Sequence, residues 1–221
     1  MAEAFVVQVG RSGIRAGDPA VRAQVRAEFD ARHLVRLPAF LEPGLLERLA
    51  AHMEHASWVE RRHNTEEERE WAADLKVDDT FSSTFMFLLN DAALFQEIDA
   101  ITGCGPFSCF VPNVYKVDPS QGHYDSWHDD VARGGLVALS INLGRAPYEG
   151  GVLQVRRKHT TAILHEIRNS RFGDALLLRI APELEHYLTP VTGMAPRVAA
   201  AGWFQASPSY PELFRRRATP G

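Results

Sequence analysis

Hydrophobic positions in the first half of the chain recur mainly at the spacing of an α-helix. Around residue 50, apolar side chains repeat every three or four residues and predict an amphipathic helix: Leu45, Leu46, Leu49 and Met53. A second helix is expected over residues 18–33, where Asp18 can cap the first turn and Pro19 fits the first helical position. A third is expected over residues 90–103, with Gly103 at its end. Up to about residue 103 the chain is therefore expected to be mainly helical, with one short strand in LVRLPAFL.

From about residue 106 the pattern changes to short runs that are typical of β-strands. Apolar and β-branched segments alternate with turns that contain Gly, Pro or Asn. About eight strands are expected in this half, within FSCFVPNVYKV, HYDSWHD, GLVALSINL, GVLQV, TAILHEI, DALLLRI, EHYLTPV and RVAAAGWFQA. Their number and spacing predict a sandwich, a barrel or a jelly roll. Alternating βαβ units are absent from the pattern, which argues against a doubly wound parallel sheet.

The chain is expected to form one domain made of three parts. Residues 1–105 are predicted to supply a helical lead-in and supporting helices, residues 106–207 the β-rich core, and residues 208–221 a C-terminal tail. A length of 221 residues suits a single core of this size. The predicted fold class is therefore mainly β with flanking N-terminal helices, an α+β arrangement.

Charge, apolar runs and cysteine content limit the kinds of partner that are expected for this chain. The net charge is −4, so the chain lacks the basic surface expected of a nucleic-acid-binding protein. No apolar run approaches the ~20 residues that cross a bilayer, and the N-terminus lacks the features of a signal peptide. The two cysteines, Cys104 and Cys109, do not make a disulfide framework. A cytoplasmic protein with neither nucleic acid nor a membrane as partner is expected, and its oligomeric state is left open.

Candidate metal chemistry lies in GHYDSWHDD, residues 122–130, which contains the pattern His-x-Asp twice. The pairs are His123 with Asp125 and His128 with Asp130. In a regular strand alternate side chains share a face, so the two pairs are predicted to point in opposite directions. One such pair supplies two of the three ligands in the two-histidine, one-carboxylate set of non-haem Fe(II) oxygenases. A second histidine must then come from elsewhere.

Three histidines further along the chain are candidates for that ligand: His159, His165 and His186. His159 follows a basic turn and is expected to be exposed, whereas His165 lies between two strand-like runs. His186 opens an apolar strand after a turn, where a ligand can point into the mouth of a barrel. Arg197 begins another apolar strand. It either reaches solvent or grips a carboxylate inside the barrel through two parallel hydrogen bonds.

Together these segments resemble the Fe(II)- and 2-oxoglutarate-dependent oxygenases, in the branch that includes the prolyl hydroxylases. The resemblance covers roughly residues 106–207 and rests on NVYKVDPSQGHYDSWHDD, SINLGRAPYEGGVLQV, FGDALLLRI and HYLTPVTGMAPRVAAAGWF. The specific feature is the order of His-x-Asp, a later histidine in H-x4-V-T-G, and an arginine after it. The resemblance implies a double-stranded β-helix, which is a form of jelly roll.

The resemblance also implies a role for individual residues. It selects the second of the two pairs, so that His128, Asp130 and His186 are expected to be both the metal ligands and the catalytic centre. Arg197 is expected to bind the far carboxylate of 2-oxoglutarate. Tyr115 occupies a position where such enzymes often place a hydroxyl beside this co-substrate.

Other residues of the motif receive lesser roles or depart from the family pattern. Ala199 stands where the family often has Ser or Thr, so a supporting hydroxyl either comes from elsewhere or is missing. His123 and Asp125 are expected at the surface or behind the ligands. Trp127 is expected to pack on the helical layer. Asp129 is expected to face away from the metal, and of two roles, orienting a neighbouring loop or lying in solvent, the second is preferred.

The activity implied by the resemblance is that of a dioxygenase that uses Fe(II), 2-oxoglutarate and O2 and releases succinate and CO2. The reaction is expected to be hydroxylation of an unactivated C–H bond in a small molecule, an amino acid or a peptidyl residue. One alternative is a cupin-like metalloenzyme that does not use 2-oxoglutarate, which needs a third histidine or a glutamate near His128. Another is a non-catalytic jelly-roll binding module. The polar segment 56–85 is expected to be either part of a lid or a plain surface connection.

Overall fold

The largest sheet of the molecule has seven strands in the order β3-β11-β7-β14-β6-β5-β4, and neighbouring strands are antiparallel. The computed structural model describes residues 5–64, 70–77, 79–121, 123, 125–168 and 171–212. The strands of this sheet are β3 (Leu34–Leu37), β4 (Trp58–Asn64), β5 (Glu70–Val77), β6 (Cys109–Val117), β7 (Val137–Asn142), β11 (Ala175–Arg179) and β14 (Arg197–Gln205).

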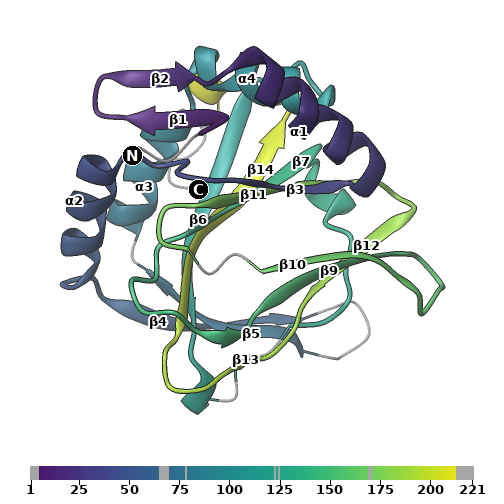
Figure 1. The fold of residues 1–221 in the computed structure, drawn as a ribbon. Helices are drawn as coiled ribbons and strands as arrows, with labels where there is room; N and C mark the ends of the chain where they lie inside the picture. The colour runs from purple at the N-terminus through teal and green to yellow at the C-terminus, as the bar shows by residue number, and fades with distance from the viewer. Residues whose placement is uncertain are drawn as a thin grey trace.

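A smaller sheet lies on the side of the large sheet that faces away from the helices (Figure 1). Its strand order is β10-β9-β12, with β9 (Val152–Arg157), β10 (Ile163–Arg168) and β12 (Leu184–Leu188). Two short pairs complete the β structure: β1 (Val7–Gly10) with β2 (Gly13–Ala16), and β8 (Glu149–Gly150) with β13 (Val191–Thr192). The mainly β fold class predicted from the sequence is confirmed.

In the described part of the chain four α-helices cover the other face of the large sheet: α1 (Pro19–Arg32), α2 (Pro43–Met53), α3 (Asp79–Leu89) and α4 (Ala92–Thr102). The Asp18 side chain accepts a hydrogen bond from the Ala20 backbone at 2.7 Å and so caps α1, as expected. Gly103 ends α4 with φ of 61°, a left-handed conformation that glycine adopts readily. The local signals in the sequence therefore place α1, α2 and α4 correctly.

Alternation along the strands gives the large sheet two different faces. Leu177 of β11 is fully buried in the main core between sheet and helices. Its neighbours Leu176 and Leu178 point the other way and pack with Val155 and Leu184 of the smaller sheet. The space between the two sheets is therefore a separate layer, and the side chains that line it come from every second position.

The first half of the chain contains more β structure than its sequence pattern predicts. Strand β3 was expected from LVRLPAFL and pairs with β11, but β1, β2 and the hairpin β4–β5, which extends the opposite edge of the large sheet through β6, were not expected. Segment 56–85, interpreted as a lid or a surface connection, instead contains β4, β5 and much of α3. Residues 65–69 and 78 of that segment lie outside the described residues. These strands depend on long-range backbone pairing, which local periodicity does not report.

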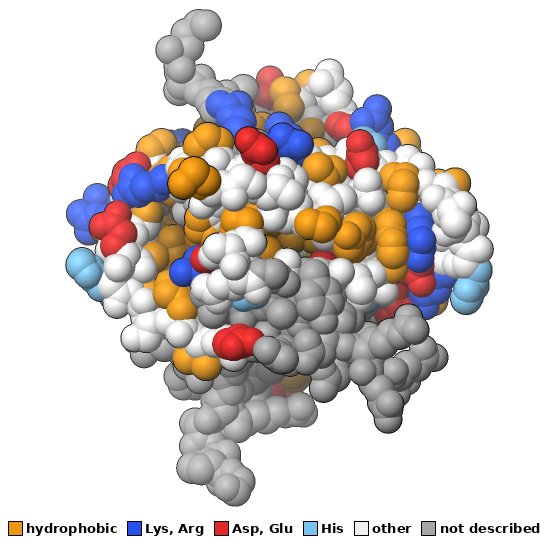
Figure 2. Space-filling model, turned by 90° about the horizontal axis from the view of Figure 1, so that it is seen from below, with side chains coloured by type: hydrophobic (Ala, Val, Ile, Leu, Met, Phe, Trp, Pro, Cys, Tyr) orange, Lys and Arg blue, Asp and Glu red, His pale blue; other side chains and the backbone are white. Residues whose placement is uncertain are grey.

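No helix within the described residues is long and apolar enough to span a membrane. Figure 2 shows the molecule from below, with basic and acidic side chains interspersed around the rim and hydrophobic side chains across the middle. On the described part of this face, charge of one sign does not form a continuous surface. This distribution agrees with the small net charge of −4.

Candidate active site

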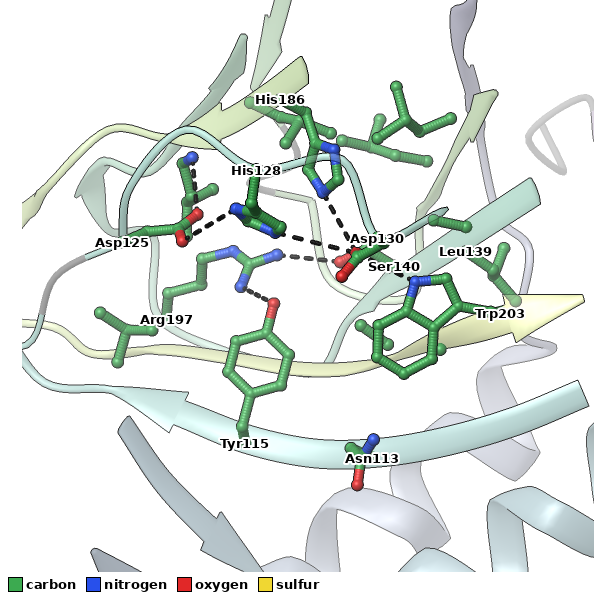
Figure 3. A pocket seen from close by; sticks show the side chains of 18 of the residues that line it. Asn113, Tyr115, Asp125, His128, Asp130, Leu139, Ser140, His186, Arg197 and Trp203 are labelled. Carbon is green, nitrogen blue, oxygen red and sulfur yellow. Dashed lines mark hydrogen bonds and ion pairs between the residues drawn. The ribbon is translucent and has the colours of Figure 1, made fainter. Parts of the chain in front are cut away.

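Three residues with metal-ligand side chains converge between the two sheets: His128, Asp130 and His186 (Figure 3). The Nε2 atoms of His186 and His128 lie 3.4 Å and 3.7 Å from Oδ2 of Asp130. One ligand atom from each of the three residues falls within 4.8 Å of the others. In the part of the chain that the structure describes, no other group of three His, Cys, Asp or Glu side chains is this close. The sequence-predicted ligand set is therefore brought together in space.

The backbone holds the two histidines in place. His128 and His186 form an isolated antiparallel bridge in which each N–H donates to the carbonyl of the other, at 3.1 Å and 2.8 Å. Residues paired in this way project side chains on the same face of a sheet. Their rings lie 4.2 Å apart between centroids. Asp130, two residues after the bridge, has φ of 56°, a left-handed conformation that aspartate tolerates better than most residues.

The hydrogen bonds of His128 fix which ring nitrogen is available. Its Nδ1 lies 2.6 Å from the backbone carbonyl of Ser126. A carbonyl can only accept, so Nδ1 carries the proton and Nε2 presents a lone pair toward Asp130. Asp125 also approaches Nδ1, at 3.5 Å. A carbonyl or carboxylate behind the ring is the usual support of a metal-ligating histidine.

The protonation states of the cluster also suit a metal. Burial would raise the pKa of Asp130, but the hydrogen bond and charge of His186, followed by His128 and Arg133, lower that pKa to about 2. Burial and the charge of His186 lower the pKa of His128 below its usual value, although Asp125 and Asp130 oppose this change. At neutral pH the carboxylate is therefore charged and the His128 imidazole is neutral, which are the forms that bind metal. Two imidazoles and one carboxylate fit Fe(II).

A buried cation lines the same cavity. Arg197 of β14 is 4% exposed, and its guanidinium donates to the Tyr115 hydroxyl at 2.6 Å and to Ser140 Oγ at 2.9 Å. Among the described residues, no carboxylate forms an ion pair with Arg197. A buried charge without a counter-ion is costly, so this arrangement fits a site that receives an anion.

The cavity between these groups has a volume of about 170 Å³. The metal-type cluster and the pair Arg197 and Tyr115 both line it, and the Arg197 guanidinium is drawn beside the cluster (Figure 3). Apolar side chains from three strands form much of the remaining wall: Leu153, Leu176, Leu178 and Ala201. All five residues singled out as site candidates in the sequence line this one cavity.

Ser140 is a site residue that the sequence pattern did not reveal. It lies on β7 directly opposite Ala201 of β14, and its hydroxyl reaches Arg197. Ala199 stands where the family often has Ser or Thr, so it offers no hydroxyl, and it is fully buried. Ser140 therefore supplies a hydroxyl to Arg197 from the neighbouring strand. The only signal in the sequence is its position in the alternation of GLVALSINL, and the strand register is needed to interpret it.

The described residues of GHYDSWHDD, 122–130, do not form a regular strand, so the prediction that its two His-x-Asp pairs face opposite ways is wrong. Between residues 123 and 130 the only strand-type pairing in the described chain is the bridge at His128. His123 and Asp125 line the same cavity as the ligand candidates. The Asp125 side chain bonds to the adjacent Ser126 N–H and accepts from Leu188 N. Such local side-chain bonds compete with a strand ladder and turn the backbone.

Trp127 and Asp129 also differ from expectation. Trp127 packs on Tyr187, with ring centroids 5.3 Å apart, and under the Arg156 guanidinium, rather than on the helical layer. Asp129 does not simply face solvent, because it forms an ion pair with Lys158 and accepts a hydrogen bond from Val131 N at 2.9 Å. Asp129 therefore ties the loop after the ligand candidates to β9 and its following turn.

Residues 112–205 match the model of the 2OG-Fe(II) oxygenase superfamily. This range contains every sequence-predicted site residue. A comparison with curated protein sequences gave no match. The family resemblance inferred from the motifs is confirmed, and the cofactors of this class are Fe(II), 2-oxoglutarate and O2.

Solved structures show the same fold at low sequence identity. A 2OG-Fe(II) oxygenase family oxidoreductase from Burkholderia pseudomallei has a TM-score of 0.64 at 15% identity, covering 91% of this chain and 97% of the other. A prolyl hydroxylase from Trichoplax adhaerens, bound to a peptide of hypoxia inducible factor, has a TM-score of 0.64 at 15% identity, covering 91% and 94%. The α-ketoglutarate-dependent epimerase SnoN of nogalamycin biosynthesis has a TM-score of 0.64 at 15% identity, covering 86% and 84%. The double-stranded β-helix predicted from the sequence is confirmed.

Proposed function

We propose that this chain, a 2-oxoglutarate- and Fe(II)-dependent oxygenase, hydroxylates an unactivated C–H bond and holds its iron through His128, Asp130 and His186. The observation that carries the proposal is a single cavity lined both by a metal-type cluster and by a buried arginine that has no acidic partner among the described residues. A dicarboxylate co-substrate with one end at a metal and the other at a guanidinium matches this arrangement. Succinate and CO2 are the expected products of the co-substrate.

Bound Fe(II) supplies the oxygen-activating redox chemistry that amino-acid side chains do not provide. The protein supplies orientation and charge around it. His128 offers Nε2 because its Nδ1 proton is held by Ser126 O. Asp130 contributes negative charge, since its pKa is about 2. These side chains leave space in the cavity for the co-substrate and for O2.

We assign the far carboxylate of 2-oxoglutarate to Arg197, Tyr115 and Ser140. Arg197 is positioned by both hydroxyls, and its planar guanidinium is suited to a carboxylate with two parallel hydrogen bonds. The co-substrate would neutralise a charge that the described part of the fold buries without an acidic partner. This gain favours binding of a dianion over that of an uncharged molecule of the same size.

The apolar wall keeps water from the reacting groups. Leu153, Leu176 and Leu178 face the cavity between the sheets. A site with little water strengthens the interactions of the buried charges and limits side reactions. The walls therefore favour a substrate that brings an apolar C–H group into the cavity.

The proposed substrate is a small molecule, an amino acid or a peptidyl residue. Two of the similar structures support both a peptide and a small molecule as substrate. The prolyl hydroxylase holds a peptide, and SnoN is an epimerase of nogalamycin biosynthesis. A cupin-like enzyme without 2-oxoglutarate is the less favoured alternative. In the described residues neither a third histidine nor a glutamate joins the ligand cluster near His128.

Turnover of the purified protein with Fe(II) and 2-oxoglutarate tests the proposal. Amino acids, proline-containing peptides and small apolar molecules are offered in turn, and succinate is measured. We expect succinate to form only when Fe(II), O2 and 2-oxoglutarate are all present, and to increase with a true substrate. A protein that binds Fe(II) but never converts 2-oxoglutarate would support the cupin-like alternative instead.

A further inference from the structure

Both oxygens of the Asp130 carboxylate are held by residues outside the ligand cluster. Arg133 Nε lies 3.1 Å from Oδ1, and Trp203 Nε1 donates to Oδ2 at 3.0 Å. The two contacts come from different parts of the fold, since Arg133 belongs to the 3-10 helix η2 (Val131–Arg133) and Trp203 to β14. Figure 3 shows the Trp203 indole on one side of Asp130 and the histidines on the other.

The two supporting residues are themselves fixed. The Arg133 guanidinium lies over the Trp203 ring, 4.9 Å from its centroid, and the Arg133 carbonyl accepts from Gln205 Nε2 at 2.7 Å. Gly135 leaves room for the indole, because a Cβ there would lie 2.7 Å from Trp203 Cδ1. The guanidinium, the indole and the carboxylate therefore form one packed unit.

We propose that Arg133 and Trp203 are positioning residues that make Asp130 offer a single oxygen, Oδ2, to the metal. The proposal rests on the proposed iron site. Oδ2 is the oxygen nearest both histidines, at 3.4 Å and 3.7 Å, whereas Oδ1 is paired with Arg133. A carboxylate that binds through both oxygens takes one more coordination position than one that binds through a single oxygen. Engaging Oδ1 keeps that position for the co-substrate and O2.

The two residues act on different steps, so their variants should differ. The indole N–H donates to Oδ2 and fixes the direction in which it points, so its loss should weaken metal binding, as loss of an outer-shell partner typically does. The Arg133 charge repels a metal cation but occupies Oδ1. Removing it should leave metal affinity intact or increased, while freeing Oδ1 to compete with 2-oxoglutarate for the metal.

The chain offers a matched control for both substitutions. Arg156 also lies over a tryptophan, with its guanidinium 3.9 Å from the Trp127 ring centroid. Arg156 pairs with Glu185 at 2.9 Å, and neither member of this stack has a described contact with Asp130. The variants are therefore Trp203→Phe and Arg133→Met, and the controls are Trp127→Phe and Arg156→Met.

Mn(II) binding to the full-length, metal-free protein tests the proposal without turnover. Mn(II) is titrated by electron paramagnetic resonance, and 2-oxoglutarate is then titrated calorimetrically into the Mn(II)-loaded protein. We expect Trp203→Phe to weaken Mn(II) binding by about tenfold. Arg133→Met should bind Mn(II) at least as tightly as the unaltered chain, but bind 2-oxoglutarate about tenfold more weakly. Both controls should stay within about twofold for both ligands.

Each result decides between the two proposals. Unchanged Mn(II) affinity in Trp203→Phe together with unchanged 2-oxoglutarate affinity in Arg133→Met overturns the positioning role while leaving the iron site intact. An unaltered chain that fails to bind Mn(II), or whose binding survives His128→Ala, overturns the iron site and with it the positioning role. Arg133 is partly exposed, so its variant keeps the test decisive if the Trp203 variant folds poorly.

Discussion

Backbone hydrogen bonds between His128 and His186 hold the two residues in position without the help of a metal. Each donates its N–H to the carbonyl of the other, although the two residues belong to segments far apart in the sequence. The spacing of the imidazoles is therefore set by strand geometry, and not by long flexible side chains. A site built on backbone pairing is more rigid than one built on a loop alone.

His128→Ala should abolish Fe(II) binding and 2-oxoglutarate-dependent succinate formation, because one of only two imidazoles in the cluster is lost. His123→Ala should keep Fe(II) binding, since His123 accepts from the Asp118 N–H and has no atom in the ligand group. Metal content of the purified variants and succinate yield are the measurements. Equal loss of iron from both variants, with the fold intact, would show that the wrong His-x-Asp pair has been chosen.

Arg197→Met should raise the KM for 2-oxoglutarate by about a hundredfold, because hydrogen bonds to a charged group contribute about 1.5–3 kcal/mol each. Metal binding should persist. A thermal shift gives a second measurement: 2-oxoglutarate should stabilise the metal-loaded unaltered protein far more than the variant, since a ligand stabilises only a state that binds it. Equal stabilisation of both would mean that another residue receives the carboxylate.

The variant Ser140→Ala removes the hydroxyl that contacts Arg197 in place of the Ser or Thr that the family often has at position 199. We expect the KM for 2-oxoglutarate to rise about tenfold, less than for the arginine variant, because Arg197 and Tyr115 remain paired. Ser140→Thr restores a hydroxyl and should recover part of the loss. If Ser140→Ala behaves like the unaltered enzyme, the Ser140 hydroxyl has no part in co-substrate binding.

Stability should decrease as the pH falls below about 6.5, in part because of His33. Burial, together with the charges of Arg179 and Arg157, lowers the pKa of His33 in the folded chain. Below the pKa of the unfolded state, the unfolded chain binds a proton that the folded chain does not, so protonation favours unfolding.

The variant His33→Asn removes this titration, and asparagine suits the left-handed backbone at this position, where φ is 61°. Chemical denaturation at pH 7.5 and pH 5.5 provides the measurement. The loss of unfolding free energy between these pH values should be smaller in His33→Asn than in the unaltered chain. An identical loss in both proteins would show that His33 does not contribute to the lower stability at acidic pH.

Features decided by nearby residues were predictable from the sequence. The caps of α1 and α4 depend on Asp18 and Gly103, and each acts within a few residues. Most strands of the second half were also predicted, because their apolar alternation is continuous. The hairpin β4–β5 was not, since its place in the sheet depends on pairing with β6, more than thirty residues later.

In the candidate site, too, some features were predictable from the sequence and others were not. The order of His128, Asp130, His186 and Arg197 follows from the motif, and the structure brings these residues to one cavity. The conformation of the motif was missed, because the local hydrogen bonds of Asp125 prevent a regular strand. The role of each residue as ligand or co-substrate contact stays a prediction, as does the division of the chain into lead-in, core and tail.

The position of β14 has a consequence for how the proposed site is assembled. Among the described residues this strand is the last in sequence, yet it lies in the middle of the large sheet between β7 and β6. The two earlier strands cannot be joined until it arrives, so folding has to wait for contacts between distant segments, which are slow to form. Arg197 and Trp203 both lie on β14, so the proposed site gains its anion-binding arginine and the indole beside Asp130 only after this strand has inserted.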